Sequence, residues 1–180
     1  MASEVARVAR RLEEAKATKH LNLSKCELLK IPDGCYLMLK GVSITTCDLS
    51  SNSLKRIPSK FFSKFPLLEE LNLQGNKLSS LPEEIRDLEE LERLDLTSNI
   101  FDTFPLPVCD CPKLKNLSLR DNKITDLEVS RLNSMSALVE LDIQDNPLSA
   151  DTQTALSDMD WFTVHLGESD PVGKSLDKLD

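Results

Sequence analysis

Glycine and histidine are scarce in this chain of 180 residues, which has five glycines and two histidines. So few glycines leave no glycine-rich segment of the kind that cradles phosphate groups, and no nucleophile-elbow pattern occurs. His20 and His165 stand near opposite ends of the chain, so they are not expected to act together. These absences argue against phosphate-loop enzymes and against catalysis by paired histidines.

Basic residues are outnumbered, since 22 Lys and Arg stand against 30 Asp and Glu and the formal net charge is −8. A nucleic-acid partner is therefore not expected, because neutralising phosphates requires a basic stripe. No run of about 18 apolar residues occurs, which predicts that nothing spans a membrane. Residues 1–16 lack the apolar stretch of a secretory signal, so none is expected.

Acidic residues come in pairs at Glu69–Glu70 and Glu89–Glu90, but in short segments that are expected to be exposed. Acid–base catalysis needs a pocket that shifts a pKa, and a solvated surface explains these pairs better. We therefore expect no enzyme, no cofactor and no bound metal.

Cysteine occurs five times. Cys26, Cys35, Cys47 and Cys111 fall where the repeats described below need small apolar residues, whereas Cys109 is expected to be exposed. An odd number with none in the flanks favours a reducing compartment, and hence the cytoplasm or the nucleus. A secreted protein with disulfides is the alternative. Zinc at Cys109 and Cys111 is not expected, because no second pair or histidine cluster accompanies them.

The main feature of the chain is an internal repeat. Its second apolar position recurs every 23 to 26 residues, within the range of about 20–29 for short structural repeats. The six segments that fit the pattern LxxLxLxxNxL are Thr18–Leu28, Ile44–Leu54, Leu68–Leu78, Leu91–Phe101, Leu114–Ile124 and Leu138–Leu148.

Each repeat predicts a short strand. Leu94 and Leu96 are two apart and share the inward face, so Arg93 and Asp95 must point outward. An asparagine follows the strand, and its amide can donate to and accept from backbone groups of the turn. We expect these amides to form an internal ladder; they belong to Asn52, Asn76, Asn99, Asn122 and Asn146.

The second half of each repeat predicts a short helix or tight helical turn. In Ser80–Leu91, apolar residues recur at helical spacing after Pro82. One repeat cannot bury its apolar side alone, so the repeats must stack. The expected fold is an α/β solenoid: a short arc of about six repeats, with a parallel β-sheet on the concave face, short helices or turns on the convex face, and an N-terminal capping helix.

The LPxxIxxLxxL segment Leu81–Leu91, together with the repeats over residues 18–148, resembles the intracellular leucine-rich-repeat proteins. That class includes Ras-suppressor-like and scribble-like scaffolds. The resemblance implies the solenoid fold and a role in binding other proteins. It does not identify the partner, because such repeats serve many unrelated partners.

The two ends of the solenoid need caps. Over residues 1–17, apolar residues at helical spacing predict a capping helix, with a membrane-binding or partner-binding helix as the alternative; they are Val5, Val8, Leu12 and Ala15. Residues 149–166 are expected to form the C-terminal cap. It should contain a helix over Asp151–Met159 with Asp151 near its N-cap, a last irregular strand in residues 161–166, and Trp161 over the end of the core. The polar segment 167–180 is expected to be disordered.

The outward strand positions form columns across the concave face, and these columns are the candidate binding site. Arg93 and Arg120 are the expected anchors, because hot spots favour arginine, and the lack of aromatic residues favours a charge-steered contact. A solvated face with binding elsewhere is the alternative. The candidate residues are Asp48, Glu70, Asn72, Arg93, Asp95, Asn116, Arg120, Glu140 and Asp142.

We predict a monomeric, non-catalytic adaptor that binds a protein partner of basic character through this polar, acidic face. The alternative is a regulatory or targeting subunit of an enzyme such as a phosphatase or a small GTPase. Nothing in the sequence separates these two functions.

Overall fold

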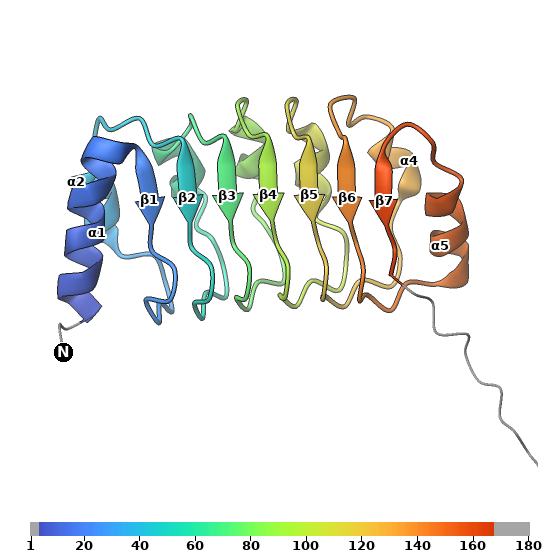
Figure 1. Cartoon of the computed structure of the whole chain (residues 1–180), viewed down its shortest axis with the longest axis horizontal. Coiled ribbons are helices and arrows are strands. Elements are labelled where there is room, and N and C mark those ends of the chain that lie inside the picture. Colours follow the sequence, from blue (N-terminus) through green and yellow to red (C-terminus); the bar gives the residue numbers. More distant parts are fainter. Residues whose placement is uncertain (1–3, 168–180) are drawn as a thin grey trace, which may run out of the picture.

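The strands of the computed structural model, which describes residues 4–167, lie side by side in a single sheet (Figure 1). All neighbouring pairs are parallel, and the sheet order follows the chain from first to last. The strands are β1 (His20–Asn22), β2 (Thr46–Asp48), β3 (Glu70–Asn72), β4 (Arg93–Asp95), β5 (Asn116–Ser118), β6 (Glu140–Asp142) and β7 (Thr163–His165).

Each three-residue strand aligns residue for residue with the next. The middle residues are paired along the sheet, as Leu71 is with Leu94 and Leu94 with Leu117. They point into the core, since Leu71, Leu94 and Leu117 are all buried. The expected register of the six repeats is confirmed, and β7 lies in the segment where a last strand was expected.

Short helical segments return the chain behind the sheet (Figure 1). They are α2 (Asp33–Met38), α3 (Lys60–Lys64), η1 (Glu83–Asp87), η2 (Leu106–Asp110) and α4 (Val129–Leu132). The two η segments are 3₁₀ helices, which are wound more tightly than α-helices. Pro82 precedes η1 in extended backbone, which a fixed proline φ and a missing N–H permit at a helix start. Together these elements confirm the α/β leucine-rich-repeat solenoid.

The asparagine ladder exists, and Asn99 shows how it works. The Nδ2 of Asn99 donates to the carbonyl oxygens of Leu96 in its own repeat and of Leu73 in the preceding repeat, both at 3.0 Å. Its Oδ1 accepts from the N–H of Leu78, also in the preceding repeat, at 3.0 Å. Asn52, Asn76 and Asn122 are buried in the same way, and Asn146 is half-buried. Buried backbone groups need such partners, so the ladder joins each repeat to the one before it.

The first repeat has Cys26 at the ladder position, and an arginine from outside the repeat compensates. In later repeats the ladder Nδ2 donates to the carbonyl two residues earlier, as Asn52 does to Ser50. At Cys26 the corresponding carbonyl belongs to Ser24, and the Nη1 of Arg11 donates to it at 2.5 Å. The same nitrogen lies 3.2 Å from the Cys26 Sγ. The guanidinium group therefore takes part of the role of the missing amide.

The N-terminal helix α1 (Glu4–Thr18) lies alongside β1 (Figure 1). Leu12 and Ala15 are buried against the first repeat, but Val8 is only half-buried and Val5 is 77% exposed. The expected apolar stripe therefore packs most closely through Leu12 and Ala15, with Val8 partly buried against the core and Val5 exposed. None of the helices formed by residues 4–167 is long and apolar enough to cross a membrane.

At the C-terminal end, two details differ from expectation. Helix α5 (Ala150–Ser157) is capped by Ser149, whose Oγ accepts from the N–H of Thr152 at 3.3 Å, and not by Asp151. Trp161 is 40% exposed, whereas Phe162 is 8% exposed and enters the core. A side chain two residues from a strand centre points to the same face, so Phe162, together with Val164, faces inward. The polar segment expected over 167–180 lies outside the described residues except for Gly167.

All five cysteines are free and buried, including Cys109, which was expected to be exposed. Cys109 lies in η2, where the tight helical turn places it against the core with an exposed fraction of only 4%. Burial raises the pKa of Cys35 and Cys109 to about 11 and that of Cys111 to about 12. These thiols therefore stay protonated at neutral pH and are poor nucleophiles.

Candidate partner-binding face

The candidate site lies on the concave face, which is the outer side of the sheet formed by β1 to β7. Strand alternation places it there, because the residues on either side of each buried strand centre point away from the core. The register then brings equivalent residues of neighbouring repeats together: Glu70 pairs with Arg93, and Asn72 with Asp95.

Two shallow depressions on this face contain eight of the nine predicted residues. The first, of about 240 Å³, is lined by Asp48, Glu70, Asn72, Arg93 and Asp95, and also by His20 and Thr46. The second, of about 200 Å³, is lined by Arg93, Asp95, Asn116, Glu140 and Asp142, and also by Ser118. Arg120 lies in neither depression. Arg93 and Asp95 belong to both, so they mark the centre of the site.

The outward residue that follows each buried strand centre forms what we call the central column, and in it three aspartates occupy the alternate strands β2, β4 and β6. Each uses one carboxylate oxygen to accept from the backbone N–H two residues later: Asp48 at 2.9 Å, Asp95 at 2.9 Å and Asp142 at 3.1 Å. These bonds fix the carboxylates in place. Within residues 4–167 the second oxygen of each accepts no hydrogen bond. A partner's cation or N–H donor can therefore reach it without breaking an existing bond.

The two predicted anchor arginines already have carboxylate partners. The Nε of Arg93 lies 3.7 Å from Glu70, and the Nε of Arg120 lies 2.8 Å from Asp145. All four side chains are about half exposed or more, so these pairs are weak and can exchange partners. Arg93 remains accessible at the centre of the face, whereas Arg120 stands apart from both depressions.

His165, in β7, also lies at the site, although it was not among the residues predicted from the sequence. Its Nε2 lies 3.0 Å from the Oε1 of Glu140, whose Oε2 accepts from the Nδ2 of Asn116 at 2.8 Å. At the other end of the sheet, His20 contacts Thr46. His165 was missed because residues 161–166 do not carry the repeat pattern. The signal that could have found it is strand alternation, which aligns His165 with Asp142.

The site has the chemistry of a contact surface. Its nine predicted residues carry five carboxylates and two guanidinium groups, so it is net acidic. Both depressions are small and open, and polar side chains from neighbouring strands line each of them. In the part of the chain that the structure describes, no group of three or more His, Cys, Asp or Glu residues could hold a metal ion.

Comparison with known proteins finds family profiles and individual proteins that match this chain. A family profile described as leucine rich repeat matches residues 42–101, and a second, described as leucine rich repeats (2 copies), matches residues 112–157. Leucine-rich repeat-containing protein 20 of Mus musculus is 44% identical over 174 residues, which cover 94% of this chain and 95% of that protein. The Homo sapiens protein of the same name is 41% identical over 96 residues, covering 51% of this chain and 52% of its own.

Solved structures share the fold. A leucine-rich-repeat protein of Leptospira interrogans superposes with a TM-score of 0.69 at 27% identity, over 78% of this chain and 35% of that chain. The leucine-rich repeat domain of APL1B superposes with a TM-score of 0.64 at 22% identity, over 82% of this chain and 42% of that chain. This chain thus spans less than half of either neighbour.

Proposed function

Because the chain belongs to the leucine-rich-repeat family, we propose that it is a non-catalytic adaptor that holds a protein partner of basic character on its concave face. In this proposal the solenoid over residues 18–148 provides the surface, and residues 1–17 and 149–166 close its two ends. The nine candidate residues contact the partner, with Arg93 and Asp95 at the centre. The protein works as a monomer, since a single copy carries the whole face.

The fixed carboxylates of the central column support this proposal most directly. Asp48, Asp95 and Asp142 are held by backbone hydrogen bonds, so these side chains lose little conformational entropy when a partner binds. No aromatic side chain lines either depression, which favours a polar contact of moderate affinity over a dry interface. Charge of one sign would steer a basic partner to the face and would make association sensitive to salt.

The cysteines support a location in the cytoplasm, with the nucleus as the alternative. Five free, buried thiols suit a reducing compartment, where disulfides do not form. In this setting the adaptor would serve intracellular signalling complexes.

Charge reversal on the concave face tests the proposal. Proximity labelling in cells identifies candidate partners of the wild-type protein, and their binding is then compared with that of the double variant Asp95→Lys, Asp142→Lys. We expect binding to fall at least about tenfold, because like charges across an interface cost several kcal/mol and each 1.4 kcal/mol is about tenfold.

The matched control carries the same change in net charge on the opposite side of the molecule. Asp87 and Glu89 are exposed beside η1, so Asp87→Lys, Glu89→Lys should leave binding unchanged. Equal binding by wild type and both double variants would place the partner elsewhere. Equal loss in both would show a general charge effect and no specific face.

A further inference from the structure

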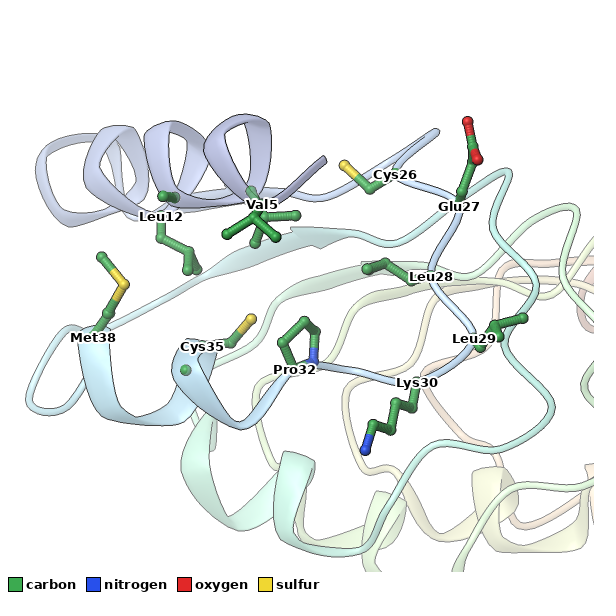
Figure 2. Close-up of a pocket in the computed structure, with 13 residues that line it drawn as sticks. Val5, Leu12, Cys26, Glu27, Leu28, Leu29, Lys30, Pro32, Cys35 and Met38 are labelled. Atoms are coloured by element: carbon green, nitrogen blue, oxygen red, sulfur yellow. The ribbon is translucent and has the colours of Figure 1, made fainter. Parts of the chain in front are cut away.

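An apolar cleft of about 470 Å³ opens at the N-terminal end of the solenoid, between α1 and residues 26–38 (Figure 2). One wall is the α1 stripe of Val5, Val8 and Leu12. The opposite wall includes Leu28, Pro32 and Met38, and the buried thiols of Cys26 and Cys35 also border the cleft. Its volume falls in the range of about 300–1,000 Å³ that is typical of ligand sites. It shares no lining residue with the depressions of the concave face.

The cleft exists because the first repeat is only partly covered. Leu28 corresponds to Leu54 and Leu78 in the next repeats, and both of those are completely buried, whereas Leu28 is only half-buried. The next repeats are covered by their neighbours, but here α1 covers only the side toward β1. Leu29 and Val5 are consequently 75% and 77% exposed on the two sides of the cleft. Contiguous exposed apolar surface of this kind marks interaction sites.

Residues 1–41, the segment of the chain that contains both walls of the cleft, have a net charge opposite to that of the whole molecule. Residues 1–41 contain eight Lys and Arg against five Asp and Glu, in a chain whose net charge is −8. Three of the acids, Glu13, Glu14 and Asp33, are neutralised in ion pairs. Six cations form no ion pair within residues 4–167; they are Arg7, Arg11, Lys19, Lys25, Lys30 and Lys40. Glu27 lines the cleft with Lys30, and both side chains point away from it (Figure 2).

The lining also indicates how an occupant would bind. No strand residue lines the cleft, so there is no free strand edge to which an extended peptide could add. Side chains form both walls, and the α1 stripe spans two helical turns, or roughly 10 Å at about 1.5 Å per residue. This geometry suits the apolar face of a second helix, whose anchors recur at positions i, i+3 or i+4, and i+7.

We propose that this cleft binds an acidic amphipathic helix of a partner protein, which inserts its apolar anchors between α1 and residues 26–38 and directs its carboxylates toward Lys30, which lines the cleft, and Arg11, which contacts Cys26 in its lining. The site is separate from the concave face, so the chain would bring two partner segments of opposite charge together. The simplest helix that matches this cleft has leucines on one face and glutamates on the other.

Designed peptides test the proposal by fluorescence anisotropy of a labelled probe with the full chain. The first peptide is a helix with leucines at i, i+3, i+4 and i+7 and glutamates elsewhere; the second has lysine in place of each glutamate; the third is a scrambled form of the first. We expect the glutamate peptide to bind at least about tenfold more tightly than the other two. Equal binding of the glutamate and lysine peptides, or of the scrambled peptide, would overturn the proposal.

Two variants locate the binding site without disturbing the core. Val5→Asp with Leu29→Asp replaces exposed side chains, and Gly34→Met fills the cleft from α2, where an added Cβ meets no atom within 4 Å. Each should weaken binding of the glutamate peptide at least about tenfold. Val139→Asp, an exposed apolar residue far along the chain, is the matched control and should have no effect. Loss in the control, or no loss in the cleft variants, contradicts the assignment.

Other occupants give distinct results, each of which would overturn the proposal. A concentration-dependent dimer in sedimentation, abolished by the Val5→Asp, Leu29→Asp variant, would show that a second copy fills the cleft. Binding of decanoate but not of the peptide would show a small-amphiphile site. The Asp95→Lys, Asp142→Lys variant should bind the peptide as the wild-type protein does. Failure of the concave-face proposal can therefore be distinguished from failure of the cleft proposal.

Discussion

Single side chains hold this fold together at positions where a repeat cannot satisfy its own backbone. The ladder amide succeeds because asparagine offers both donors and an acceptor in a short side chain. Cys26 offers no comparable donor, and Arg11 provides it from α1. The cysteine was predictable as a buried position, but its pairing with Arg11 was not, since that contact depends on how α1 packs beside β1.

Replacing Arg11 with alanine should lower the free energy of unfolding by about 1–3 kcal/mol, because the Ser24 carbonyl loses its donor. Adding Cys26→Asn to this variant should restore part of the loss, since the new amide can donate to the same carbonyl. Urea unfolding followed by circular dichroism measures both effects. Arg10 is the control, because it forms only an exposed pair with Glu14, and Arg10→Ala should cost less than about 1 kcal/mol. Equal costs for the two arginines would contradict the assigned role.

Among the elements, each turn that leads into the ladder uses a left-handed residue. Six residues that directly precede the ladder positions have φ between 53° and 65°, and their types share no pattern: Lys25, Ser51, Gly75, Ser98, Asp121 and Asp145. Only Gly75 adopts this conformation without a steric cost. The fixed turn therefore overrides the local preference of Lys25, Ser51 and Ser98, whereas aspartate tolerates the left-handed conformation.

Gly75→Ala should destabilise the protein by about 1–2 kcal/mol, which is the cost of left-handed backbone for a residue with a Cβ. The added Cβ would lie 3.6 Å from Ser51, an ordinary contact, so strain and not collision sets the cost. Ser98→Gly should change stability by less than about 1 kcal/mol, because relief of strain is offset by a more flexible unfolded chain. Thermal unfolding compares the two variants. A larger loss for Ser98→Gly than for Gly75→Ala would contradict this explanation.

Repeat length explains which convex elements are α-helical, and this could have been predicted. The two steps of 23 residues, from Leu71 to Leu94 and from Leu94 to Leu117, contain the 3₁₀ segments η1 and η2, whereas the longer steps contain α2, α3 and α4. A 3₁₀ helix rises about 2.0 Å per residue and an α-helix about 1.5 Å, so a shorter return segment needs the more extended form.

The strands and their register followed from the repeat every 23 to 26 residues, and the outward columns followed from the alternation of side chains along each strand. The burial of Cys109, the inward turn of Phe162 and the Ser149 cap did not, because they lie outside the regular pattern. The candidate site was predictable to the same extent as the strands. His165 was missed because β7 lacks the repeat motif, and the cleft beside α1 was missed because periodicity says nothing of how completely a helix covers its neighbour.

At the scale of the whole molecule, one continuous core contains four of the five thiols, and the burial of Cys35, Cys109 and Cys111 links stability to pH. The pKa of Cys35 and Cys109 is raised by burial to about 11 and that of Cys111 to about 12, against an ordinary value of 9.0. A raised pKa means that the unfolded chain releases these protons first. The stabilisation is therefore complete below pH 9 and is lost as the pH rises from 9 toward 12.

Urea unfolding at pH 7, 8.5 and 10 should show little change between the first two values and a clear fall in the free energy of unfolding at the third. A variant with Cys109→Ala and Cys111→Ala should show a shallower fall over the same range, because two of the linked groups are gone. Identical slopes for wild type and variant would show that other groups govern the alkaline loss.

The ladder bonds also have a direction. Asn76 donates to the carbonyl of Leu49 and accepts from the N–H of Leu54, both of which lie earlier in the chain, and Asn52 and Asn122 likewise point backward. During translation, every newly emerged repeat therefore locks the one made just before it. A nascent chain that stalls on the ribosome leaves only its newest repeat unsealed, so assembly can keep pace with synthesis from the first repeat to the last.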